Sequence, residues 1–269
     1  MISLPLVYTI LALIAYTSSF WYLFIRLMSK RTPNLWCYGL MVGLGLVLHA
    51  TVLSQDMLTS IGVNYDVFNL MSFTSGLMLA LSLILSLIRP ILPLNLIGTP
   101  VAAFGLILGF AFSQPNQVIE QHSFGLDLNI ILSLAAYAVL LMATIHAVLL
   151  WFQDRELKKK QKRRIWVNLL PPFQVMESVL FDLIITGFGL LTVALLFGFF
   201  TIDNFFAQHL AHKTAFSIIS WFLYGALLIG HYKFGWRGRK AIRFTITGCA
   251  LLAIGFMGSK FVLEMILGR

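Results

Sequence analysis

Residues 127–164 read DLNIILSLAAYAVLLMATIHAVLLWFQDRELKKKQKRR. The first part, 127–151, is almost entirely apolar, and a helix needs roughly 20 such residues to cross the hydrocarbon core of a bilayer. The second part ends in a dense run of Lys and Arg, which membrane proteins retain on the cytoplasmic side. This stretch therefore predicts a transmembrane helix whose carboxyl end faces the cytoplasm.

The rest of the chain has the same apolar character. It is 59% hydrophobic and 11% charged, with a mean hydropathy of +0.89. A soluble domain could not bury that much apolar surface, so lipid must solvate it. We predict an all-α polytopic membrane protein in which eight transmembrane helices form a single domain over residues 1–269. The expected spans are about 4–25, 35–54, 67–88, 91–113, 127–151, 176–200, 214–232 and 244–267, with a basic cytoplasmic loop at 152–175.

Basic residues fall into alternate gaps between these spans. They are Arg26, Lys30, Arg31, Arg89, Arg155, Lys158, Lys159, Lys160, Lys162, Arg163, Arg164, Lys233, Arg237, Arg239, Lys240 and Arg243. The exceptions are Lys213, Lys260 and Arg269. This alternation predicts that the N-terminus and the C-terminus both lie outside, in the periplasm, and that the first span is an uncleaved anchor. The net charge of +9 then serves orientation and contact with anionic lipids, so we expect membrane lipids and no nucleic acid as partners.

Prolines and glycines predict local features of the helices. Pro171 and Pro172 mark a stop before the sixth span, because proline lacks a backbone donor and disfavours helix before it. Thr99 followed by Pro100 resembles an N-cap with proline at the first helical position, so we expect the regular helix of the fourth span to begin there. The pairs Gly39/Gly43 and Gly105/Gly109 predict close contacts between helices.

Motifs of soluble enzymes are absent from the sequence. It contains no Walker loop, no GxSxG elbow and no HExxH helix. Cys37 and Cys249 are isolated within expected spans, without CxxC, CxxCH or zinc-binding spacing. We therefore predict no catalytic residues, no disulfide and a function that is not enzymatic.

Histidines within the spans are the strongest candidates for a chemical role, since ionisable groups inside a bilayer are costly. His49 lies near the outer end of its span, whereas His146 and His231 lie near cytoplasmic ends and differ in depth by about one helical turn. Neutral imidazole is a common axial ligand of haem iron, so depth favours His146 with His231 as a pair. A hydrogen bond to a carbonyl or water is the alternative for each histidine. His49 would join an external site with one of the loop histidines, His122, His209 or His212.

The region around His231 resembles a known family. A span containing WFLY at 221–224 and then His231 is followed by GWRGR at 235–239. This ending is similar to that of the CcsA/HemX-type cytochrome c assembly proteins. Further segments resemble the same family, and the eight-span form is similar to its YpjD-like branch of proteobacterial inner membrane proteins. These segments are 170–172, 187–192, 45–49 and 68–73.

The resemblance implies haem binding in the bacterial inner membrane, with His49 and His231 at the family's intramembrane histidine positions. Depth instead pairs His231 with His146, so all three are candidate axial ligands of haem b and no other metal is expected. The chain departs from the family at three places. Asn129 replaces an external histidine, 203–213 lacks a Trp-rich external signature, and Asp182 occupies a usually basic position.

Two functions remain open. The first is an accessory protein of cytochrome c assembly that binds or relays haem b between helices, with other cytochrome c biogenesis proteins as partners. The alternative is a haem-free scaffold or regulatory subunit of a membrane transport complex. Members of the YpjD-like branch often have genes beside CNNM/CorC-type cation transporters, which makes such a transporter the implied partner.

Overall fold

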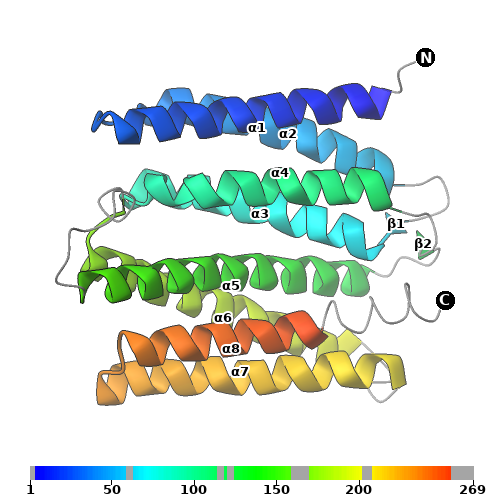
Figure 1. Cartoon of the computed structure of the whole chain (residues 1–269). Helices are drawn as coiled ribbons and strands as arrows, with labels where there is room; N and C mark the ends of the chain where they lie inside the picture. Colours follow the sequence, from blue (N-terminus) through cyan, green and yellow to red (C-terminus); the bar gives the residue numbers. More distant parts are fainter. Residues whose placement is uncertain are drawn as a thin grey trace. The chain divides into compact units, whose positions relative to one another are not determined.

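The computed structural model describes residues 4–58, 63–113, 118–119, 124–158, 170–201 and 208–255, which are predominantly helical. Within these residues, seven helices are long and apolar enough to cross a membrane, and they confirm an all-helical, multi-pass membrane protein. The chain divides into two compact units (Figure 1). Unit 1 comprises residues 1–122 and 164–171, and unit 2 comprises residues 123–163 and 172–269.

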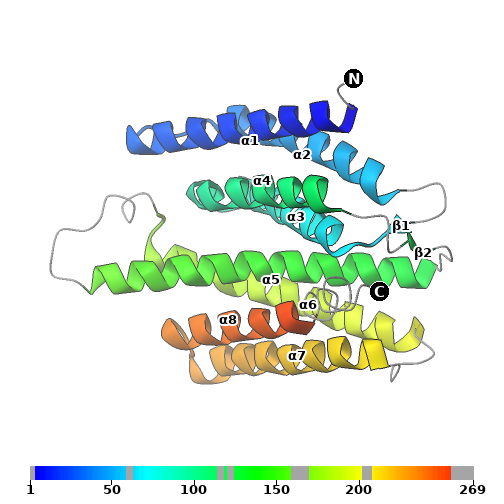
Figure 2. The same cartoon turned by 45° about the vertical axis from the view of Figure 1, so that its right-hand side comes forward.

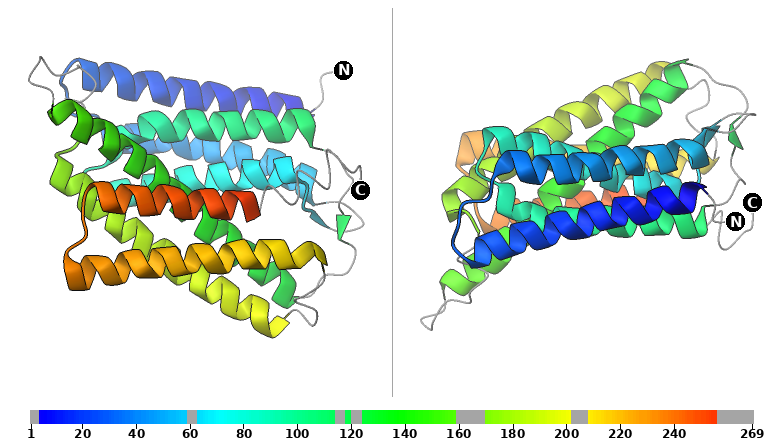
Figure 3. Two further views of the ribbon diagram at one scale, coloured as in Figure 1. Left: turned by 60° about the horizontal axis from the view of Figure 1, so that its bottom comes forward. Right: turned by 90° about the horizontal axis from the view of Figure 1, so that it is seen from above.

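Unit 1 is a ring of four antiparallel helices. The helices are α1 (Leu4–Met28), α2 (Leu35–Met57), α3 (Val67–Ile88) and α4 (Asn95–Phe112). Both α1 and α3 pack against α2 and α4, as the views from the side and from above show (Figures 2 and 3). Two short antiparallel strands, β1 (Val63–Asn64) and β2 (Val118–Ile119), lie at the end where α3 begins. Buried Tyr16, Tyr38 and Leu79 lie in the hydrophobic core of this unit.

The start of α4 differs from the expectation. A short 3₁₀ turn at Leu92–Leu94 leads directly into α4, so the regular helix begins at Asn95, and the predicted start at Pro100 is wrong. The Thr99 hydroxyl is no N-cap, because it donates to the Asn95 carbonyl one turn earlier at 2.9 Å. The fully buried Asn95 side chain bonds to Ser82 and Ser86 of α3, and these bonds fix the helix start before the proline.

The two small-residue pairs behave differently. On α4, a Cβ at Gly109 would lie 2.8 Å from the Ser72 Cβ, and one at Gly105 would collide with Ser75. The prediction of a close contact is confirmed for this pair, which packs on α3. A Cβ at Gly39 would meet only Leu83 at 4.0 Å, and one at Gly43 would meet nothing within 4 Å. The same prediction is therefore wrong for α2, because the pattern records small residues and not the presence of a neighbouring helix.

Unit 2 repeats the ring arrangement. Its helices are α5 (Phe124–Leu157), α6 (Phe173–Thr201), α7 (Gln208–Phe234) and α8 (Arg239–Ala253). Here α5 and α7 each pack against α6 and α8, so α5 and α7 occupy opposite corners of the ring. The predicted stop at Pro171 and Pro172 is confirmed, because α6 begins at the next residue. The helix α7 begins six residues before the expected span, at 208 instead of 214, so placing His209 and His212 in a loop was wrong.

Basic residues gather at one end of each unit. In unit 1, Arg26 lies in the last turn of α1 and Arg89 directly follows α3. In unit 2, Arg155 lies in the last turn of α5, Lys233 in the last turn of α7, and Arg239 begins α8. The positive charge therefore lies at alternate helix ends, which are the ends next to the gaps that contain the basic residues in the sequence. The second half of the expected eighth span, 256–267, lies outside the described residues, as does the basic run 159–169.

Candidate functional site

A tight reversal between α7 and α8 positions His231. Gly235 and Gly238 have φ angles of 64° and 55°, a left-handed backbone that glycine adopts without steric cost. The reversal brings the Trp236 backbone N–H to the Gly230 carbonyl at 3.1 Å and lays the indole against Gly230. The GWRGR segment is therefore a structural turn, and its Trp236 carbonyl points back at the His231 ring.

The His231 ring is held on two sides. Its Nδ1 lies 2.9 Å from the Trp236 carbonyl oxygen, and its face stacks on Phe181 of α6 with ring centroids 3.6 Å apart. Because a carbonyl oxygen only accepts hydrogen bonds, Nδ1 carries the proton, and the neutral ring leaves a lone pair on Nε2. In the described part of the chain, this Nε2 has no hydrogen-bond partner. His231 is half-buried and presents one free basic nitrogen.

His146 has the same arrangement in a more buried setting. It lies on α5, is 2% exposed, and its Nδ1 donates to the Met142 carbonyl one turn earlier at 2.9 Å. Its Nε2 is buried and has no hydrogen-bond partner among the residues that the structure describes. Leaving a buried acceptor unpaired costs about 1–3 kcal/mol. Such an atom in a native protein calls for a water, an ion or a ligand.

His49 of α2 is bound at both ring nitrogens. It is 3% exposed, its Nδ1 lies 3.1 Å from the Tyr16 hydroxyl of α1, and its Nε2 lies 2.8 Å from the Ser72 hydroxyl of α3. Neighbouring glycines make room for these rings, since a Cβ at Gly45 would lie 2.6 Å from Tyr16 and one at Gly76 would lie 3.2 Å from His49. The histidine thus links three helices. Tyr16 was not predicted from the sequence. The only indication of it there is Gly45, one turn before His49, which leaves room for the tyrosine ring.

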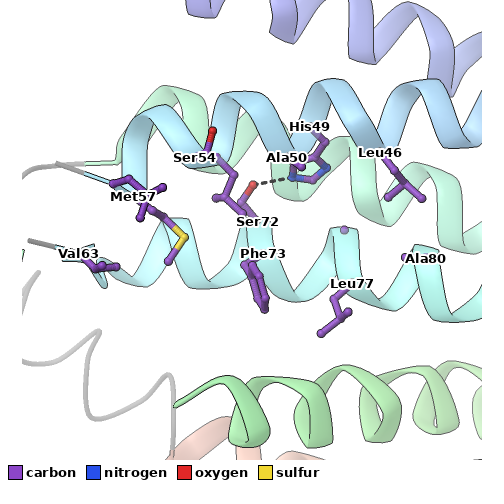
Figure 4. A pocket seen from close by; sticks show the side chains of 13 residues that line it. Leu46, His49, Ala50, Ser54, Met57, Val63, Ser72, Phe73, Leu77 and Ala80 are labelled. Atoms are coloured by element: carbon purple, nitrogen blue, oxygen red, sulfur yellow. Dashed lines mark hydrogen bonds between the residues drawn. The ribbon is translucent and has the colours of Figure 1, made fainter. Parts of the chain in front are cut away.

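A cavity of about 380 Å³ lies beside His49, between α2 and α3 (Figure 4). Leu46, Met57 and Leu77 are among its mainly apolar lining, whereas His49 and Ser72 form a hydrogen-bonded polar pair on its wall. Apolar pockets with a few convergent polar groups are typical ligand sites. Any ligand that bonds to the imidazole here must first displace one of its hydroxyl partners.

Within the described residues of unit 2, the structure does not bring His146 and His231 into contact. His49 belongs to unit 1, whereas His146 and His231 lie on opposite helices of unit 2. In the described ranges, no hydrogen bond or ring contact joins His146 to His231, and no group of three or more His, Cys, Asp or Glu side chains could hold a metal ion. His122 lies outside the described residues, and the side chains of His209 and His212 do as well.

Comparison with known proteins shows the family of this chain. The model of the cytochrome c assembly protein family matches residues 4–267, nearly the whole chain. The chain belongs to this family. It is 32% identical to the inner membrane protein YpjD of Escherichia coli (strain K12) over 271 residues, which cover 97% of this chain and 99% of that protein.

The chain is also similar to a second protein over part of its length. This second protein is an uncharacterized 28.8 kDa protein of Azospirillum brasilense, 31% identical over 172 residues, which cover 61% of this chain and 62% of that protein. No solved structure matches the chain.

The cytochrome c assembly family is associated with haem. The three candidate histidines of this chain differ in how well they fit that group. Neutral imidazoles bind haem iron through a ring nitrogen while the other N–H donates to a carbonyl or carboxylate. His146 and His231 both meet this requirement, because their Nδ1 atoms bond to backbone carbonyls. His49 meets it only after a rearrangement, because both of its nitrogens are already bonded.

Proposed function

We propose that this chain is an accessory protein of cytochrome c assembly in the bacterial inner membrane, and that it binds or relays haem b between its helices. It performs no bond-making chemistry of its own. The match over 4–267 and the 32% identity to a relative named an inner membrane protein support this proposal. Positive charge at alternate helix ends supports an orientation with eight spans and both termini in the periplasm.

The buried, unpartnered Nε2 of His146 is the observation that carries the haem assignment. His231, which presents the same free nitrogen, is the first candidate ligand because motif and geometry both select it. The Met142 and Trp236 carbonyls keep the proton on Nδ1, so each Nε2 is held ready to donate a lone pair. Haem supplies an iron atom that accepts such a lone pair and changes oxidation state.

His49 is the third candidate ligand, and it could bind iron only after one of its two hydrogen bonds is broken. The Ser72 hydroxyl must turn away from Nε2 before that nitrogen can bind iron, and Ser72 lines the cavity into which a ligand would enter. The rotation of a hydroxyl is a small movement. The loss of the bond costs about 0.5–1.5 kcal/mol, which a metal bond readily offsets.

An absorption spectrum tests the proposal. The full-length protein, purified in detergent from haem-replete cells, should show a Soret band, and a pyridine haemochrome assay should identify haem b. His231→Ala should reduce or shift that band. Tyr224→Phe is the matched control, since it removes a different buried hydrogen bond of unit 2, to the Thr245 carbonyl, and should leave the spectrum unchanged.

A colourless protein would overturn the haem assignment. If that colourless protein also retained a stoichiometric membrane partner, the result would establish the alternative, a haem-free scaffold or regulatory subunit of a transport complex. The absence of Trp between 203 and 213, where haem-handling members carry a Trp-rich signature, is the observation that favours this second function.

A further inference from the structure

A second concave surface lies at the basic end of unit 2, between α5 and α8, which pack side by side (Figure 3). This groove has a volume of about 510 Å³ and is remote in sequence from the apolar cavity beside His49. Its walls combine three arginines, one aspartate and a set of aromatic and branched side chains. The residues used below are Trp151, Asp154, Arg155, Arg239, Arg243 and Ile246.

Apolar and charged groups are sorted along the groove. Trp151 on α5 and Ile246 on α8 lie farther from the basic ends of their helices, and both are exposed, at 39% and 37%. Arg155 lies one turn beyond Trp151, and Arg243 lies one turn closer to the helix end than Ile246. The groove therefore changes from apolar to cationic over about one helical turn, at the depth where the basic loops begin.

Most of the positive charge in the groove is not neutralised by an acidic side chain of the groove. Asp154 is its single acid, and that carboxylate already accepts from Lys158 at 2.6 Å and from the Arg239 Nε at 3.2 Å. The Arg155 guanidinium lies over the Trp151 ring, 5.6 Å from its centroid, which holds it at the rim. Arg243 is exposed and has no ion-pair partner in the described part of unit 2.

We infer that this groove binds the phosphate headgroup of an anionic glycerophospholipid, whose acyl chain lies along Trp151 and Ile246. Guanidinium groups match phosphate oxygens in a planar, bidentate geometry. Basic pockets between transmembrane helices at the cytoplasmic side are typical sites for acidic lipid headgroups. A free phosphate would satisfy the arginines but not the exposed apolar wall that continues from them, and for this reason the occupant is a lipid.

Quenching of Trp151 by brominated lipids tests the assignment. The full-length protein is placed in bilayers of phosphatidylcholine with a small fraction of either dibrominated phosphatidylglycerol or dibrominated phosphatidylcholine. Because the chain has six tryptophans, the difference between the wild type and Trp151→Phe isolates the signal of this residue. We expect stronger quenching by the anionic lipid, with half-saturation at a several-fold lower mole fraction.

Arginine variants then locate the headgroup. Each of Arg239→Gln and Arg243→Gln should weaken the preference for the anionic lipid about 5-fold, since one cation near the surface contributes on the order of 1 kcal/mol. Arg243→Gln is the safer variant, because it breaks no ion pair. Arg237→Gln is the matched control, an exposed arginine of the same end outside the groove, and it should change nothing.

Three results would overturn the inference. Equal quenching by the two brominated lipids, or an unchanged preference in Arg243→Gln, would show that the arginines only orient the helices. Abolition of the lipid preference by millimolar inorganic phosphate would show that the groove binds a free anion. Persistence of the preference in that buffer would support the lipid. None of these results depends on whether the protein binds haem.

Discussion

His49 and His146 are buried to nearly the same degree, 3% and 2% exposed, yet their surroundings differ. In unit 1, the hydroxyls of Tyr16 and Ser72 occupy both nitrogens of His49. In unit 2, only the Met142 carbonyl bonds to His146, and the other nitrogen remains unpaired among the described residues. Burial alone therefore does not rank the two histidines as candidate ligands. The number of satisfied nitrogens does.

Helix contacts give a physical cause for this difference. In unit 1, Gly45 of α2 lies against the Tyr16 ring and Gly76 of α3 lies against His49, and such small residues let the helices approach closely enough for the hydroxyls of α1 and α3 to reach the histidine on α2. His146 sits on a helix whose buried neighbours are apolar, among them Ala143, Ala147 and Leu150. Among the described residues, no side-chain hydroxyl bonds to its Nε2.

The largest expected effect comes from replacing each histidine with leucine in haem-free protein. His49→Leu leaves two buried hydroxyls without their partner, so we expect it to lower the free energy of unfolding by about 2–4 kcal/mol. His146→Leu removes one hydrogen bond, to the Met142 carbonyl, but also a buried atom that is already unpaired, so its cost should stay within about 1 kcal/mol. Thermal or denaturant unfolding of the two variants in the same detergent measures the difference. Equal losses would break the contrast between the two sites.

Single hydroxyl deletions sharpen the description of the His49 site. Tyr16→Phe and Ser72→Ala each remove one bond to the ring, and each should cost about 1–2 kcal/mol of unfolding free energy. Combined with His49→Leu, either deletion should cost much less, with a coupling of roughly 0.5–3 kcal/mol in a double-mutant cycle. Strict additivity would mean that the observed bonds contribute nothing to stability.

Much of the fold could be predicted from the sequence because a bilayer imposes length and composition on each span. The third helix begins and ends where the apolar run does, at Val67 and Ile88. The start of α4 could not be predicted, because it depends on Asn95 reaching Ser82 and Ser86 on another helix. The absence of a neighbouring helix at Gly43 of α2 could not be predicted either. A local pattern of glycines carries no information on which helix lies opposite.

The candidate site could be predicted only in part. Costly ionisable residues in apolar runs selected His49, His146 and His231 directly. Their hydrogen-bond partners were hidden, because Tyr16 and Ser72 are separated from His49 by 33 and 23 residues and follow no periodicity with it. Depth along the membrane grouped His146 with His231, but the structure shows no contact between them in the described residues. Depth ranks positions along a helix and does not say which way a side chain points.

A smaller effect is expected from a methyl group placed beneath His49. A Cβ at Gly76 would lie 3.2 Å from the imidazole, which must then move by a few tenths of an ångström within its hydrogen bonds. Gly76→Ala should therefore cost about 1 kcal/mol of unfolding free energy, despite the better helix propensity of alanine. Gly43→Ala, where the added methyl meets nothing, is the control and should be neutral or slightly stabilising. A neutral Gly76→Ala would show that the His49 ring is not rigidly held.

An effect of similar size concerns the stacked pair of unit 2. Phe181→Leu removes the aromatic face against which His231 rests at 3.6 Å but keeps the hydrogen bond to Trp236, so unfolding should become easier by about 0.5–1.5 kcal/mol. If the backbone carbonyl alone directs Nε2, bound haem should remain, with at most a small displacement of the Soret band. If haem is lost as completely as in His231→Ala, the ring stack and not the hydrogen bond orients the ligand. The difference between His231 and His49 as candidate ligands would then depend on ring packing as much as on hydrogen bonding.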